Sequence, residues 1–171
     1  MELGGVYKFS SDIIGNGEID LADGGVLSHT VQANADSARI ENIVLLNGGS
    51  VSMLDNKLSN LEIENVEVNE NSQLAIDIDF ATQKADTIDV NNLVVNDGNI
   101  NLSAINIINQ GTALSEKEYL INILNAENVE VNNGNDFNIS VENKEIYSPI
   151  FKYPPTWVAT GADKTAGLKL L

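Results

Sequence analysis

An irregular repeat built around asparagine most strongly constrains what this chain can fold into. Four segments align with one another: IENIVLLNGGSV from Ile40, IENVEVNENSQL from Ile63, VNNLVVNDGNINL from Val90 and AENVEVNNGNDF from Ala126. The third residue of each segment is an asparagine: Asn42, Asn65, Asn92 and Asn128. These asparagines are spaced by 23, 27 and 36 residues. Irregular repeats of this length are typical of solenoids, in which each unit buries its apolar face against the next.

Around the asparagines, apolar and polar residues alternate with a period of two. Leu61 and Ile63 alternate with Glu62 and Glu64, and a corner at Asn65 resets the phase for the next strand. This alternation indicates half-buried strands. The short corners leave little room for crossover helices, so the simplest closed arrangement stacks coil on coil. The sequence therefore predicts an all-β parallel β-helix with aliphatic ladders inside and stacked, hydrogen-bonded asparagines at the corners.

Composition supports strands rather than helices. Hydrophobic residues make up 43% of the 171 residues and aromatics only 5%, so leucine, isoleucine and valine must supply most of one continuous core. One stretch leaves an alternative open. Ser115 to Glu118 has the form of a capping box, and Leu120, Ile121 and Leu124 could follow it as a helical stripe. The alternation of Tyr119, Ile121 and Ile123 favours a strand instead.

The last third of the chain is richer in aromatic residues and holds all 3 prolines. The aromatic residues in this part are Tyr119, Phe137, Tyr147, Phe151, Tyr153 and Trp157. The open end of a stack of coils must be covered, and large aromatic side chains suit that role. We therefore interpret residues 1–114 as β-helix coils and residues 115–171 as a C-terminal coil and cap continuous with the same solenoid.

The charge of the chain excludes some partners. The net charge of −16, from 25 acidic and 9 basic residues, would repel a phosphate backbone, so we expect no nucleic-acid partner. The same charge favours a soluble monomer and leaves the binding of divalent cations by the acidic faces open. There is no cysteine, no apolar run of membrane-spanning length and no signal-peptide pattern in MELGGVYKF. We expect the chain to be a segment of a longer exported protein.

Candidate catalytic residues are few. His29 is the only histidine, and its position on an alternating strand predicts an outward-facing side chain. Carboxylates that could serve a carbohydrate-active β-helix enzyme are Asp77, Asp79, Asp86 and Asp89. Every alternating strand has acids on its polar side, so we interpret all four as part of a solvated outer face. No phosphate-binding loop or EF-hand is present, and we assign no catalytic, cofactor-binding or metal-ligating residue.

From about residue 70 onward the sequence resembles the C-terminal stretch of pertactin-like autotransporter passengers. The similarity lies in QLAIDIDFATQKADTIDVNNLVVNDGNINLSAINIINQGTALSEKEYLINIL, in IYSPIFKYPPTWV and in the closing GLKLL. Asp86 opens the second matching strand, and Phe151-Lys152-Tyr153 matches a late aromatic element. The pair Pro154-Pro155 departs from the family pattern, and the adhesive tripeptide Arg-Gly-Asp of some relatives is absent.

The resemblance implies a single-stranded right-handed parallel β-helix that is displayed outside the bacterial outer membrane or secreted. It also implies a C-terminal region that promotes folding and a parent protein anchored through a barrel that this sequence does not contain. The function expected from it is that of a non-enzymatic segment of an autotransporter-like adhesin, a rigid display stalk whose host or cell-surface receptor is unknown. The alternative is a β-helix polysaccharide lyase or hydrolase.

Overall fold

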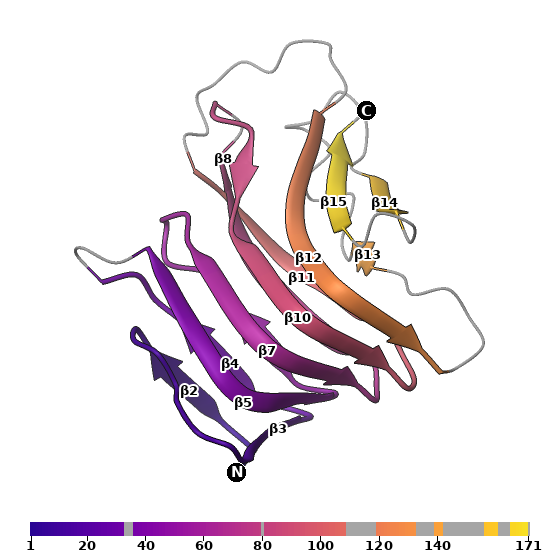
Figure 1. The fold of residues 1–171 in the computed structure, drawn as a ribbon. Coiled ribbons are helices and arrows are strands. Elements are labelled where there is room, and N and C mark those ends of the chain that lie inside the picture. Colours follow the sequence, from indigo (N-terminus) through magenta and orange to yellow (C-terminus); the bar gives the residue numbers. More distant parts are fainter. Residues whose placement is uncertain are drawn as a thin grey trace.

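Parallel strands stacked into a β-solenoid make up the described part of the chain. The computed structural model describes residues 1–32, 36–79, 81–108, 119–132, 139–141, 156–160 and 165–170. Every regular element in these ranges is a strand, and none is a helix. Figure 1 shows the strands stacked from β2 and β3 near the N-terminus to β12 and β15 near the C-terminus.

The strands form two sheets that enclose the core. The larger sheet has the order β1 (Glu2–Leu3), β3 (Glu18–Ala22), β5 (Ser37–Asn47), β7 (Asn60–Val68), β10 (Thr87–Val95), β12 (Tyr119–Val131), β15 (Thr165–Leu170) and β14 (Thr156–Thr160). The smaller sheet has the order β13 (Ile139–Val141), β11 (Ile100–Ile108), β8 (Ser72–Asp79), β6 (Ser50–Ser52), β4 (Val26–His29) and β2 (Val6–Phe9). A short strand, β9 (Lys84–Ala85), pairs with β8 in antiparallel fashion.

The register places apolar residues directly above one another from coil to coil. In the larger sheet one buried row runs through Ile40, Ile63, Val90 and Ala126. In the smaller sheet a second buried row runs through Leu27, Val51, Leu74 and Leu102. Burial of these aliphatic side chains between the sheets is the main stabilising term for such a fold. The predicted parallel β-solenoid with aliphatic ladders inside is confirmed.

The predicted asparagine corners are bends within long strands. In β7 both Ile63 and Val66 are buried, while Glu64 and Asn65 between them are half-buried. Two polar residues in succession shift the alternation by one position, so the strand must turn there to keep its apolar side chains inside. Figure 1 shows the same curvature in β10 and β12.

The parallel stacking gives way to antiparallel pairing near the C-terminus. Strand β12 pairs with β10 along one edge and with the antiparallel β15 along the other, and β14 pairs with β15. The strand interpretation from Tyr119 onward is therefore confirmed over the helical alternative, while Ser115 to Glu118 lie outside the described residues.

The predicted aromatic cap is not settled by these strands. Tyr119 lies on β12 and Trp157 on β14. Phe137, Tyr147, Phe151 and Tyr153 lie outside the described residues. An aromatic cover over the open end of the core therefore stays a prediction.

Candidate functional site

The asparagines at the strand bends form a side-chain ladder across three coils. Asn65, Asn92 and Asn128 are partners in the register of β7, β10 and β12. The Asn92 amide donates to Oδ1 of Asn65 at 3.1 Å, and the Asn128 amide donates to Oδ1 of Asn92 at 3.2 Å. The ladder pairs the half-buried side chains of Asn65 and Asn92 with each other and with the exposed side chain of Asn128.

Asn42 does not join this ladder, and its prediction as an equivalent corner residue was wrong. Ile40 pairs with Ile63, but Ile43 pairs with Asn65, so β5 has one more residue than β7 at the bend. This β-bulge moves Asn42 out of register. Its amide instead donates to the carbonyl oxygen of Gly17 at 3.1 Å.

A longer ladder follows the other polar corner of each repeat. Amides donate from each coil to the one before it: Asn47 to Asp20 Oδ1 at 2.6 Å, Asn69 to Asn47 at 2.9 Å, Asn96 to Asn69 at 2.8 Å and Asn132 to Asn96 at 2.9 Å. Sequence reasoning identified this position only as a polar turn. The sequence signal was an asparagine directly after the second run of alternating apolar residues in every repeat, as in VEVN and LVVN.

His29 is buried, which corrects the prediction of an outward-facing side chain. It is only 1% exposed and packs against the Phe9 ring, with the two ring centroids 5.1 Å apart. Nδ1 lies 3.3 Å from Oγ of Ser59, while Nε2 has no hydrogen-bond partner among the described residues. Burial lowers the pKa of His29 below its usual 6.5, against a smaller opposing effect of the Asp55 charge.

Asp77 and Asp86 also lie inside the protein, so their interpretation as a solvated face was wrong. Both are 0% exposed. The loop at residues 53–59 donates hydrogen bonds to both carboxylates, and the N–H of Asp77 on β8 donates a further one to Asp86. The loop therefore covers the acidic side of β8 and satisfies its buried carboxylates. Burial is the largest effect on Asp86 and raises its pKa to about 7, although backbone hydrogen bonds from Asp77 and Ser59 lower it.

The other two predicted carboxylates differ from each other. Asp79 is 8% exposed, and its Oδ1 accepts a hydrogen bond from the backbone N–H of Ala81 at 2.9 Å. It is therefore buried rather than solvated. Asp89 lies half-buried on the outer face of β10, where the amides of Asn60 and Asn125 donate to its two oxygens at 2.6 and 2.7 Å. Only Asp89 of the four keeps a place on the outer face.

Ser59, His29 and Asp86 are the residue types of a catalytic triad but not its geometry. Ser59 Oγ lies between the other two, 3.3 Å from Nδ1 of His29 and 3.4 Å from Oδ1 of Asp86. Nucleophilic catalysis of this type needs the histidine between serine and aspartate. All three side chains are buried, so this group satisfies interior polar atoms and presents no nucleophile to a substrate.

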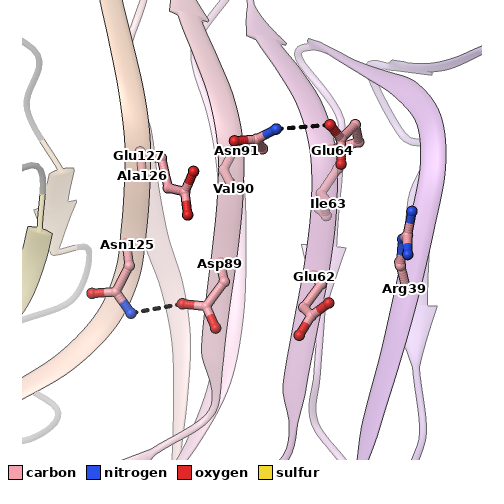
Figure 2. Close-up of a pocket in the computed structure, with 10 residues that line it drawn as sticks. All are labelled: Arg39, Glu62, Ile63, Glu64, Asp89, Val90, Asn91, Asn125, Ala126 and Glu127. Atoms are coloured by element: carbon pink, nitrogen blue, oxygen red, sulfur yellow. Dashed lines mark hydrogen bonds between the residues drawn. The ribbon is translucent and has the colours of Figure 1, made fainter.

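A polar groove crosses the outer face of β5, β7, β10 and β12. It has a volume of about 680 Å³ and is lined by Arg39, Glu62, Ile63, Glu64, Asp89, Val90, Asn91, Asn125, Ala126 and Glu127. Figure 2 shows Arg39 on β5, with carboxylates and amides following it across the neighbouring strands. The Asn91 amide donates to Glu64 at 2.7 Å, whereas Glu62 and Glu127 have no hydrogen-bond partner among the described residues.

Two properties of the described residues bear on metal binding and membrane insertion. No group of three or more histidine, cysteine, aspartate or glutamate side chains in them is placed to share a metal ion. No helix in the described ranges has the length and apolar character needed to cross a membrane.

The class of protein that these features define is a parallel β-solenoid with hydrogen-bonded asparagine ladders. Beyond that class, no family model, no curated protein and no solved structure matches the chain. The resemblance to pertactin-like passengers accordingly stays a prediction from the sequence.

Proposed function

We propose that the chain is a non-enzymatic segment of an autotransporter-like adhesin, displayed on the bacterial cell surface or secreted. Its role is that of a rigid stalk, and its C-terminal region promotes the folding of the coils before it. It acts as a monomer whose parent is anchored through a barrel, and it presents its partner, a host or cell-surface receptor, with an acidic outer surface.

The observation that best supports this role is the longer ladder, which runs from Asp20 to Asn132 through five successive strands or strand ends. Each coil is joined to the next by side-chain hydrogen bonds in addition to the parallel backbone pairing. Stability in a solenoid depends on such nearest-neighbour interfaces. Hydrogen bonds repeated from coil to coil therefore favour a rod that resists bending between coils. A rod of this kind suits display at a distance from the membrane.

Surface labelling of intact bacteria tests the proposal. The chain contains no cysteine, so Asp23→Cys at an exposed turn gives a single labelling site. The chain would be fused upstream of an outer-membrane translocating barrel and treated with a membrane-impermeant maleimide. Ser72→Cys, at a position that is 0% exposed, is the matched control and should label only in unfolded protein.

We expect labelling at position 23 but not at position 72 in the full chain. Removal of residues 115–171 should expose position 72 to the label or abolish labelling at both positions. An unchanged pattern at both positions without those residues would remove the folding role of the C-terminal region. Absence of labelling in both forms, with the protein present in the periplasm, would contradict display.

The groove supports a second candidate, a polysaccharide lyase or hydrolase. Glu62 and Asp89 occupy neighbouring positions in the register of β7 and β10, and both line the groove. A pair of carboxylates flanking a bound sugar chain is the usual requirement for glycoside hydrolysis. Under this candidate, incubation with neutral and acidic polysaccharides releases new chain ends, and Glu62→Gln lowers the rate by about 10²-fold or more. No release from any substrate would favour the stalk.

A further inference from the structure

The loop at residues 53–59, between β6 and β7, is held by carboxylates from the next coil. Oδ2 of Asp77 accepts hydrogen bonds from the backbone N–H groups of Asp55 at 2.8 Å and Asn56 at 2.9 Å. Oδ1 of Asp86 accepts one from the N–H of Ser59 at 2.8 Å. Asn56 has a φ of 64°, in the left-handed region that asparagine adopts more readily than other non-glycine residues, and these hydrogen bonds hold the loop in that conformation.

The two carboxylates are also connected to each other and to further coils. Oδ2 of Asp86 accepts a hydrogen bond from the N–H of Asp77 at 2.7 Å. The Asn106 amide donates to Asp77 and, at 2.8 Å, to Oδ1 of Asn56. In the other direction, Oδ2 of Asp55 accepts from the N–H of Val31 at 2.6 Å. Asp77, Asp86 and the loop thus form one unit, here called the clasp, that spans successive coils.

The clasp holds buried carboxylates close together without a compensating cation. Asp77 and Asp86 are both 0% exposed, and neither forms an ion pair with a lysine or arginine among the described residues. The other titratable residues on the elements around the clasp are His29 on β4, Asp36 before β5, Asp55 and Lys57 in the loop, Asp79 on β8 and Lys84 on β9. Lys57 and Lys84 are exposed, and burial lowers the pKa of His29, which disfavours its charged form.

We propose that the clasp is a pH-sensitive latch, which holds the loop at residues 53–59 most tightly in acid and loosens toward neutral pH. In the closed form, burial beside the Asp77 and Asp55 carboxylates favours protonated Asp86, and this effect exceeds that of the N–H groups of Ser59 and Asp77, which favour the ionised form. When the loop opens, Asp86 meets water and releases its proton. Opening is therefore linked to the loss of one proton, and each rise in pH favours it. The pKa of about 7 for buried Asp86 agrees with this direction.

Linkage fixes the expected size of the effect. In the open form Asp86 has an ordinary aspartate pKa near 4, and in the closed form its pKa is about 7. Between these two pH values the closed form therefore binds one proton more than the open form. The opening equilibrium should rise by nearly tenfold per pH unit across that window, about a thousandfold in total, and level off above it. His29 cannot produce this trend, since its lowered pKa makes the closed form more favourable as pH rises toward 6.5.

Amide hydrogen exchange between pH 5 and 8, above the pI of about 4.1, tests the latch in the full chain. Exchange would be followed at Asp55, Asn56 and Ser59 and corrected for the intrinsic pH dependence of exchange. The central amides of Ile63 and Val90 serve as references for global unfolding. We expect protection of the loop amides to fall toward neutral pH and to stay below that of the reference amides, because global unfolding also exposes Asp86 and carries the same pH dependence. Equal loop protection at pH 5 and pH 7 would overturn the proposal.

Two variants and one direct titration complete the experiment. Asp86→Asn, which is neutral at every pH, should remove the trend, whereas Asp89→Asn on the outer face should keep it. A trend that persists in Asp86→Asn would contradict the latch. If Asp86→Asn does not fold, carbon-13 NMR of the wild-type Asp86 carboxyl group decides. A midpoint near neutral pH supports the latch, and one close to the ordinary aspartate value refutes it.

Discussion

Removing one member of the longer ladder should weaken the stack by a measurable amount. Asn69 donates to Asn47 at 2.9 Å and accepts from Asn96 at 2.8 Å, and its side chain is half-buried. Asn69→Ala deletes both hydrogen bonds and leaves an acceptor and a donor on the neighbouring coils without partners. Each such bond contributes about 1 kcal/mol net, so the free energy of unfolding should fall by about 2 kcal/mol.

Thermal and urea unfolding, followed by circular dichroism, measure this loss. A change of about 2 kcal/mol in a chain of this length corresponds to a fall in Tm of about 4–8 °C. Asn99→Ala is the matched control, because Asn99 is exposed and its hydrogen bonds involve its backbone: its N–H donates to Asn71, and its carbonyl oxygen accepts from the N–H of Ser72. If Asn69→Ala and Asn99→Ala have the same effect within about 0.5 kcal/mol, the ladder does not stabilise the stack as reasoned here.

The remaining predictions concern a turn, the C-terminal region and solubility. Gly98→Ala should destabilise the fold strongly in urea unfolding, because φ is +75° and a Cβ would lie 2.4 Å from the carbonyl carbon of Glu70. Gly24→Ala, at φ +84° with open space around it, should cost only the backbone term of about 1 kcal/mol, and equal losses would contradict the steric argument. Deletion of residues 115–171 should lower hydrogen-exchange protection across residues 40–110, and unchanged protection would show that the coils fold without that region. Light scattering should rise as the pH approaches the pI of about 4.1, whereas aggregation at pH 8 with clean monomer at pH 4 would oppose the charge argument.

The fold was predictable because the repeat and the period-two pattern report the same geometry. Residues that the sequence alignment placed together, such as Ile63 and Val90, are direct partners in the sheet. Asn42 shows the limit of that alignment. The segments at Ile40 and Ile63 share the tripeptide Ile-Glu-Asn, yet the bulge in β5 shifts the strand by one residue. The extra residue is visible only in the spacing of the two corner asparagines, which are five residues apart at Asn42 and Asn47 but four apart at Asn65 and Asn69.

The buried polar groups were not predictable for a related reason. Alternation in β8 correctly placed Ile76 and Ile78 inside, and it placed Asp77 on the opposite side of the strand. Whether that opposite side is solvated depends on what covers it. Residues 53–59 come from another coil, and β9 returns on β8 as a short antiparallel strand. A period-two pattern predicts on which face of a strand each side chain lies, but it does not predict whether a loop from another coil covers that face.

The two buried titratable groups act on stability in opposite directions. Asp86 has a pKa raised from 3.8 to about 7, so the folded state binds more protons than the unfolded state in that range. Its contribution is present at low pH and is lost as the pH rises to neutral, a change of about 4 kcal/mol. His29 has a lowered pKa, so its contribution is present above 6.5 and is lost on acidification.

These two contributions oppose each other below pH 6.5, and only that of Asp86 still changes above it. Together, buried Asp86 and buried His29 make the free energy of unfolding vary less with pH in acid. The free energy of unfolding then falls as the pH approaches neutral. The fall starts at the clasp, because Asp86 accepts its hydrogen bonds there from Ser59 and Asp77. The buried carboxylates of the clasp thus make the loop at residues 53–59 responsive to pH, although the core around it is aliphatic. The asparagine ladders differ, because asparagine has no ionisable group and the one carboxylate in them is Asp20, at the end of the longer ladder.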